Sequence, residues 1–332
     1  MSKISVRRVL NSSLTGMQLD EILRLNERHG GTIFHEPAFN KIASEVFHTR
    51  LSYFLAMQDG LMIGFCPCHS FKDRLLTHSF SNLSSYEIPY GGWVFDDSRA
   101  SYSELLRLTP LEFTEGLHIS TSIDFDPERQ VFPIDNACST LRTLVLKICD
   151  MGAESIFDQF SSKQKNKIRR AYKVGVRAEN ISPDNFDVFW DLSSELKRRT
   201  GLKIRDKTYY KRVFSHYHNL GMAQCIAAKH HDEFISTMIL MANPNYAIAW
   251  VAGRKSDLPN NLYQNEMLFW EAIKWGISRE SKYFDFCGLD EEKLPQLARI
   301  KLSFSDDVKN FYTFTKKRMG YRVLNRLHVM IP

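Results

Sequence analysis

The sequence predicts an α/β protein with mixed sheets, organised as two units in tandem. The chain has 332 residues, which suits two domains better than one small core. Its hydrophobic fraction of 43% and charged fraction of 25% are ordinary for a globular protein, so both units can bury a core. Each half also has helices followed by a hairpin, and the hairpins lie about half the chain apart. The expected domains are therefore residues 1–140 and 141–332.

In the first half, residues 4–9 predict a strand, and residues 17–27 place apolar side chains at helical spacing. Two apolar runs, at 51–57 and 61–68, flank Asp59-Gly60, and Asp-Gly between such runs is a strong hairpin signal. Residues 89–93 include a Gly-Gly pair, which predicts a tight turn or a close approach of the backbone.

The second half repeats this order. A helix is expected from about residue 154 to 173, ending at Gly175, where glycine commonly ends helices. A second hairpin is expected to turn at His231-Asp232. The other predicted elements are strands at 141–148, 223–229, 234–241, 246–252 and 283–287, and helices at 186–199, 207–216 and 264–278.

Several classes of protein are disfavoured. The N-terminus has basic residues but no apolar stretch behind them, and no window of about 18 residues is apolar enough to span a bilayer, so we expect a cytoplasmic protein without a membrane span. The six cysteines are expected to be reduced. Cys66, Cys68 and His69 have the wrong spacing for a zinc site, and we expect no metal and no permanently bound cofactor. The sequence motifs of serine hydrolases, P-loop NTPases, dinucleotide enzymes and zincins are absent.

The net charge of +6 and the pI of about 8.9 are mildly basic. They fit a polyanionic ligand such as tRNA, a nucleotide sugar or a CoA-like carrier, and they fit equally a protein with no such ligand.

One segment resembles a known family. Residues 161–176, Ser-Ser-Lys-Gln-Lys-Asn-Lys-Ile-Arg-Arg-Ala-Tyr-Lys-Val-Gly-Val, are similar to a Ser-x-Lys-x-Arg-x-x-Ile-x-Lys-Ala-x-Lys-x-Gly-Val stretch of the FemAB family. This family contains the aminoacyl transferases that build peptidoglycan cross-bridges, with acetyltransferase-like relatives in polysaccharide loci. Further similar segments follow in the family's order, at residues 199–210, 250–253, 269–273, 283–288 and 300–304. The resemblance implies two GNAT-like units, and no heptad run long enough for the helical arm of some members is present.

Three residues are candidates for catalysis: Lys301 and Asp96 through the family resemblance, and Asp285 through its place at the end of a strand. Lys301 matches a lysine implicated in stabilising the charge that develops during aminoacyl transfer, and a cation beside an oxyanion is chemically reasonable. Asp285 ends a short strand, and either holds the acceptor amine, orients a cation or bonds the Gly288 loop. Asp96 follows the Gly-Gly loop where the family has an acid, although here Gly92 replaces a proline and the acid comes one residue late.

The candidate binding residues fall into two sets. Lys41 and Arg205 lie near positions at which family members bind a nucleotide-linked sugar precursor, and Tyr209 is expected either to stack on a ring or to belong to the core. The expected substrate-binding set also includes Trp250, Tyr90, Gly91 and Gly92. Residues 161–173 of the helix expected over 154–173 offer cations for donor phosphates, although such a charge run is equally typical of a solvated helix face. These cations are Lys163, Lys167, Arg169, Arg170 and Lys173.

Three functions remain open. The first is transfer of an aminoacyl group from aminoacyl-tRNA to an amine of a cell-wall or surface-glycan precursor, which is an amine-bearing sugar or peptide. We prefer this one slightly, because the glycine-rich loop that wraps the CoA pyrophosphate in GNAT enzymes is missing. The second is N-acylation of an amino sugar from acyl-CoA or an acyl carrier protein. The third is a non-catalytic protein that binds RNA or a glycan. The oligomeric state stays open.

Overall fold

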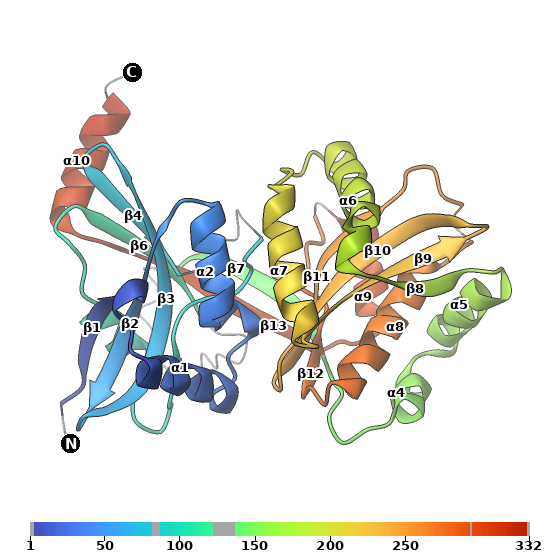
Figure 1. Ribbon diagram of the computed structural model, residues 1–332, viewed down its shortest axis with the longest axis horizontal. Coiled ribbons are helices and arrows are strands. Elements are labelled where there is room, and N and C mark those ends of the chain that lie inside the picture. The colour runs from blue at the N-terminus through green and yellow to red at the C-terminus, as the bar shows by residue number, and fades with distance from the viewer. Residues whose placement is uncertain (1–2, 82–86, 122–136, 260, 293, 331–332) are drawn as a thin grey trace. The chain divides into compact units, whose positions relative to one another are not determined.

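The computed structural model describes residues 3–81, 87–121, 137–259, 261–292 and 294–330. The chain forms two compact units (Figure 1). Unit 1 consists of Met1–Leu141 together with Asn310–Pro332, and unit 2 consists of Arg142–Lys309. The end of the chain therefore belongs to unit 1, whereas the expected second domain ran to residue 332.

Unit 1 is built on one mixed sheet in the order β1-β2-β3-β4-β6-β13, with β5 paired to β3. The pair β4–β6 is parallel and the other neighbours along this order are antiparallel. The strands are β1 (Ser5–Leu10), β2 (Arg50–Gln58), β3 (Leu61–Asp73), β4 (Leu76–Phe80), β5 (Val94–Phe95), β6 (Glu115–Ser120) and β13 (Val308–Lys317). The helices are α1 (Gly16–Arg28), α2 (Pro37–Val46), α3 (Tyr102–Leu108) and α10 (Met319–Met330).

Unit 2 has a sheet in the order β8-β9-β10-β11-β12-β7. Here β11–β12 is the parallel pair, and the other neighbours are antiparallel. The strands are β7 (Ala137–Lys147), β8 (Arg177–Ile181), β9 (Ala223–His230), β10 (Glu233–Ala242), β11 (Tyr246–Arg254) and β12 (Tyr283–Asp285). The helices are α4 (Ala153–Gln159), α5 (Ser162–Lys173), α6 (Phe186–Thr200), α7 (Lys207–Asn219), α8 (Gln264–Ser278) and α9 (Pro295–Leu302).

The two units share one topology. Each contains a strand, two helices and three antiparallel strands, followed by a helical crossover to a parallel strand. This order starts at β1 in unit 1 and at β8 in unit 2, where β7, α4 and α5 precede it. Each sheet ends in one more antiparallel strand, and these last strands are exchanged: β7 follows unit 1 in sequence but completes the sheet of unit 2, and β13 does the reverse. The mixed α/β fold and the repeated order predicted from the sequence are therefore confirmed.

Local sequence explains the turns. The φ angles are positive at Asp59 (51°) and Gly60 (79°), as the predicted Asp-Gly hairpin requires, and also at His231 (47°) and Asp232 (65°). The helix expected over 154–173 is interrupted, however. It consists of α4, which ends before the extended Phe160, and α5, which Ser161 caps by accepting a hydrogen bond from the Gln164 N–H.

Both faces of each sheet are covered. In unit 1, α1 packs Ile22 and Leu25 against one face, whereas α3 packs Tyr102 and Leu105 against the other. In unit 2, the core that contains α4, α5 and α8 lies on one face. Among the described residues, no helix combines the length and the apolar character needed to cross a membrane.

Candidate functional site

In unit 2 the parallel strands β11 and β12 pair over a short stretch and then diverge. Their pairing ends at Ile248 and Asp285, while β11 continues to Arg254. Just beyond this point β11 has a β-bulge at Trp250: on β10, Ile239 pairs with Val251 and Leu240 with Ala249, so Trp250 has no partner in the ladder. Such a bulge bends the strand. The carboxyl ends of diverging parallel strands are where α/β sheets place ligands. We therefore built the candidate site outward from the end of β12.

Lys301 reaches this end of β12 from α9. The side chain is buried, with 6% of the residue exposed, and Nζ donates hydrogen bonds to the carbonyl oxygens of Cys287 (3.0 Å) and Gly288 (2.6 Å). An ammonium has three N–H donors, so one remains beyond these two bonds in the described part of the chain. Phe304, at the end of the same segment, packs its ring 5.6 Å from that of Phe286. Lys301 is thus a fixed cation rather than a mobile surface lysine.

The loop that holds Lys301 is itself held by Asp285. Both Cys287 (φ 54°) and Gly288 (φ 76°) have left-handed backbone conformations, which turn their carbonyls toward the lysine. The fully buried Asp285 carboxylate accepts from the Cys287 N–H at 2.9 Å and from the Thr143 hydroxyl, and Thr143 accepts from the Gly288 N–H at 3.1 Å. Asp285 therefore has the contacts of a positioning residue.

Burial dominates the electrostatics of Lys301. Desolvation lowers the pKa of its ammonium, while the nearby Cys287 and Asp285 raise it in part. In a poorly hydrated environment a charge–dipole interaction is stronger than in water. A protonated Lys301 would consequently interact strongly with negative charge that develops on an atom placed beside it.

The predicted basic helix corresponds to α5, and its cations differ in their surroundings. Lys167 Nζ lies 3.0 Å from a carboxylate oxygen of the buried Glu266. The guanidinium groups of Arg169 and Arg170 lie 5.4 Å and 5.7 Å from the ring centres of Phe157 and Tyr263. The exposed cations on this helix are Lys163, Arg169, Arg170 and Lys173. Lys167 is thus occupied by an ion pair, and the exposed four remain candidates for phosphate contacts.

Of the expected substrate-binding residues in unit 2, two lie in the core. Tyr209 is fully buried, and its ring centre is 5.8 Å from that of Trp250, which is 6% exposed. Both also pack against Tyr210, at 5.3 Å and 5.7 Å. This favours the core interpretation of Tyr209 over stacking on a substrate ring. Arg205 is half-buried in the otherwise exposed segment before α7.

The expected site residues of unit 1 have structural contacts of their own. Tyr90 is fully buried against Phe311, with ring centres 5.3 Å apart, and Gly91 is buried beside it. Gly92 has φ of 89°, and a Cβ there would lie 1.9 Å from the Ser120 carbonyl oxygen, so the close approach predicted from Gly-Gly is made to the protein itself.

The remaining two candidates of unit 1 lie at its surface. Asp96 accepts a hydrogen bond from the Ser98 N–H at 3.1 Å and pairs with Arg99 at 3.3 Å. Partial burial tends to raise the pKa of its carboxyl, but the bonds from Ser98 and the charges of His29 and Arg99 lower it overall. Lys41 is exposed on α2. Asp96 is thus an ionised turn residue, with contacts unlike those around Lys301.

Two polar residues that the sequence interpretation passed over help to build unit 2. Thr143 on β7 bridges Asp285 and Gly288, and nothing local in the sequence marks it, because its partners are more than 140 positions away. Glu266 in the first turn of α8 is 5% exposed and pairs with Lys167. The sequence signal that could have singled out Glu266 was its position, since an acid in the first turn of a predicted helix is stabilised there.

Comparison with known proteins identifies the class. The fold is that of tandem GNAT-like proteins. A tandem GNAT protein from the clavulanic acid biosynthesis pathway superposes with a TM-score of 0.53 and 11% identity, over 95% of this chain and 99% of that one. A crystal structure of FemX superposes with a TM-score of 0.65 and 14% identity, over 98% of this chain and 99% of FemX.

Sequence comparison narrows the class. Residues 134–239 match the model of the FemAB family. The aminoacyltransferase FemB of Staphylococcus epidermidis is 35% identical over 63 residues, which is 19% of this chain and 15% of FemB. The chain thus spans only a small part of the length of the curated relatives it matches. Residues 134–239 are therefore similar to the FemAB family, and the fold is that of tandem GNAT-like proteins, which confirms the predicted resemblance.

Proposed function

We propose that this chain is an acyltransferase that forms an amide, moving an aminoacyl group from aminoacyl-tRNA to an amine of a cell-wall or surface-glycan precursor. The observation that carries the proposal is the buried Lys301, fixed by the carbonyls of Cys287 and Gly288 where β11 and β12 diverge. The FemAB match and the FemB similarity support the aminoacyl donor and the cell-wall acceptor.

The proposed chemistry is attack of a neutral amine on the ester carbonyl of the donor. The C–N bond forms, the carbonyl oxygen gains negative charge, the C–O bond to the ribose breaks, and the amine proton ends on the ribose oxygen. Lys301 would stabilise the oxyanion, and donors of this kind are commonly worth about 10²–10³ in kcat. In this proposal Asp285 does not touch the substrate, but fixes the carbonyls that orient Lys301.

The N-terminus of α8 favours tRNA over CoA as donor. GNAT enzymes bind the CoA pyrophosphate with a glycine-rich loop at a helix N-terminus. In this chain no glycine lies between Arg254 and Gln264, and the first turn of α8 carries the buried Glu266. This helix start therefore lacks the glycine-rich backbone that binds a pyrophosphate. In the proposed function the exposed cations of α5 contact the phosphates of tRNA instead.

The test is an amide-transfer assay with charged bacterial tRNA as donor and a peptidoglycan precursor bearing a free amine as acceptor. A parallel reaction contains acetyl-CoA. We expect transfer from the tRNA, and a loss of at least about 10²-fold in kcat for Lys301→Met. Lys211→Met, which removes an exposed lysine on α7, should retain full activity. Transfer from acetyl-CoA alone would establish the N-acyltransferase alternative, and an active Lys301→Met would remove the proposed role of Lys301.

A further inference from the structure

One end of unit 1, which we call the basic tip, brings together four segments: residues 72–76, 104–107, 112–113 and 316–323. The Thr77 N–H donates to the Thr114 carbonyl at 3.1 Å, and the Arg318 N–H donates to that of Glu115 at 3.2 Å. Lys316 Nζ donates to the carbonyls of Leu106 (2.9 Å) and Arg107 (3.0 Å). The tip therefore joins the β3–β4 turn, the end of α3, the start of β6 and the start of α10 (Figure 1).

Large apolar side chains project from this tip into solvent. The exposed fractions are 72% for Leu75, 68% for Phe113, 72% for Met319 and 53% for Val323. Thr77 pairs with Glu115 in the parallel β4–β6 ladder, and continuing that register backward places Leu75 beside Phe113. Gly320 contacts the Phe113 ring, since a Cβ there would lie 2.4 Å from it. Met319 and Val323 are one turn apart on α10, on either side of Gly320 in sequence, so the four exposed apolar side chains come from neighbouring segments, and such a grouping often marks an interaction site.

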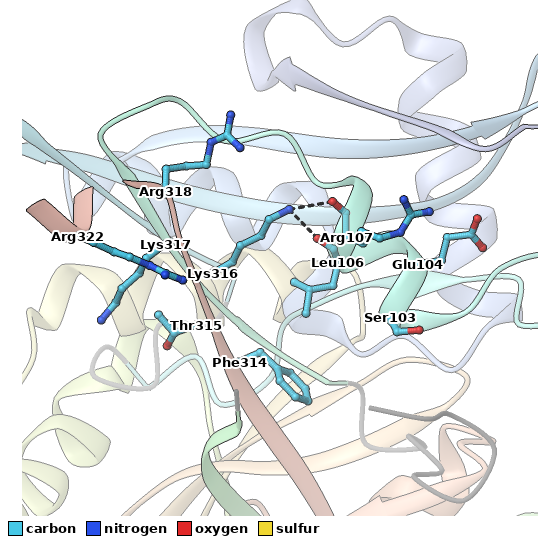
Figure 2. A pocket seen from close by; sticks show the side chains of 10 residues that line it. All are labelled: Ser103, Glu104, Leu106, Arg107, Phe314, Thr315, Lys316, Lys317, Arg318 and Arg322. Carbon is cyan, nitrogen blue, oxygen red and sulfur yellow. Dashed lines mark hydrogen bonds between the residues drawn. The ribbon is translucent and has the colours of Figure 1, made fainter. Parts of the chain in front are cut away.

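A basic cavity lies beside the apolar group. It has a volume of about 670 Å³ and is lined by residues of α3, β13 and α10, including Arg107, Lys316, Lys317, Arg318 and Arg322 (Figure 2). Glu104 is the one acid in this lining. Within the part of the chain that the structure describes, none of these five cations forms an ion pair with a carboxylate. Lys316 already donates its three N–H groups to the carbonyls of Leu106, Arg107 and Thr109, so an anion would be bound by the other four.

The charge of the whole tip is strongly one-sided. Its acids are Asp73, Glu104 and Glu112, whereas its bases are the five of the cavity lining together with Lys72 and Arg74. The neighbouring positive charges of Arg318 and Arg107 add to burial in lowering the pKa of Lys316. Mutual repulsion of this kind is relieved when a polyanionic surface approaches.

We propose that the basic tip docks unit 1 onto an anionic phospholipid surface, with a lipid phosphate in the cavity and Leu75, Phe113, Met319 and Val323 in the headgroup region. Peripheral binding of this kind combines buried apolar area with attraction to anionic lipids. A soluble phosphate ligand would use the cations but would leave the four apolar side chains in water. The proposal concerns unit 1 and does not depend on the acyl-transfer chemistry proposed for unit 2.

The experiment is flotation of the full chain with vesicles of phosphatidylcholine, alone or with roughly a third of phosphatidylglycerol. We expect binding only to the anionic vesicles, and weaker binding as salt rises. Arg318→Gln with Arg322→Gln should weaken binding about 30-fold, since each basic residue near such a surface contributes severalfold. The matched control, Arg7→Gln with Arg28→Gln, removes two exposed cations elsewhere in unit 1 and should change binding less than about twofold.

A second pair of variants separates lipid from soluble phosphate. Leu75→Ser with Met319→Ser should weaken vesicle binding at least about tenfold, because both side chains would enter the membrane interface. The control, Met17→Ser with Leu61→Ser, changes residues that are 81% and 58% exposed at other sites of unit 1, and should bind as the native chain does. The proposal fails if the anionic vesicles are not preferred, or if the Leu75/Met319 variant binds normally while inorganic pyrophosphate displaces the protein.

Discussion

Acidification from pH 7 to pH 5 should destabilise unit 1 through two buried histidines. His69 is 1% exposed, with Nε2 2.9 Å from the Asn40 Oδ1 and Nδ1 2.9 Å from the Thr49 hydroxyl. His35 is 1% exposed, with Nδ1 3.0 Å from the Thr32 hydroxyl. Burial lowers the pKa of each imidazole from 6.5 to about 4, and for His35 the backbone of Gly91 and Thr32 opposes part of that decrease.

The sign and size of the effect follow from linkage. Between pH 6.5 and 4 the unfolded chain binds protons at these histidines and the folded chain does not, so the free energy of unfolding falls as pH falls through this window. For a pKa of about 4 in the folded state, the loss from pH 7 to pH 5 is about 2 kcal/mol per histidine, or about 4 kcal/mol together. Most carboxyl groups stay ionised over this range, so they contribute less.

The assay is urea unfolding at pH 7, 6 and 5. Unfolding is monitored by hydrogen exchange of peptides from β2 and β3, which report on unit 1 alone. The variant with His35→Gln and His69→Gln should lose less than about 1 kcal/mol over the same range, whatever its stability at pH 7. His216→Gln, an exposed histidine of unit 2, should leave the loss unchanged. The reasoning is refuted if the native chain loses less than about 1 kcal/mol, or if the double variant loses as much as the native chain.

Three further variants test other contacts. Gly253→Ala would place a Cβ 2.4 Å from the backbone nitrogen of Ser193 and should cost at least about 3 kcal/mol in thermal unfolding, whereas Gly16→Ala, with nothing within 4 Å, should be neutral or stabilising. Arg8→Met leaves the buried Glu115 carboxylate without its 2.7 Å ion pair and should cost about 3–5 kcal/mol, measured the same way. Asp285→Asn removes a charge that raises the pKa of Lys301, so in the transfer assay it should lower kcat and move the alkaline limb of the pH profile to lower pH; an unchanged profile would contradict the positioning role.

The parts of the fold that local rules control were predictable. The two hairpins follow from turn residues with positive φ, and α8 begins and ends where its apolar pattern does, at Gln264 and Ser278. The exchange of β7 and β13 was not predictable, because strand pairing between distant segments leaves no local periodic signal. The second domain was accordingly drawn to the end of the chain, although β13 completes the sheet of unit 1.

The choice of candidate site residues depended on positions that the family resemblance supplied. Lys301 was selected by resemblance, and the structure then supplies its burial and its two carbonyl partners. Burial separates Tyr209 from the exposed cations of α5, and burial depends on tertiary packing that composition cannot report. Thr143 shows the same limit, since a threonine on a strand becomes informative only once Asp285 lies opposite it.

The shared topology of the two units explains why we place the chemistry in unit 2. Strand β6 of unit 1 corresponds to β12 of unit 2, because each is the parallel strand reached by the helical crossover. At the end of β6, Gly92 approaches the Ser120 carbonyl so closely that no side chain fits, and the Tyr102 hydroxyl donates to the same oxygen. At the end of β12, the equivalent place is lined by the carbonyls that bind Lys301. In unit 1 this place is thus filled by backbone, whereas in unit 2 it holds the buried Lys301, and a lysine so placed is what the proposed stabilisation of an oxyanion requires.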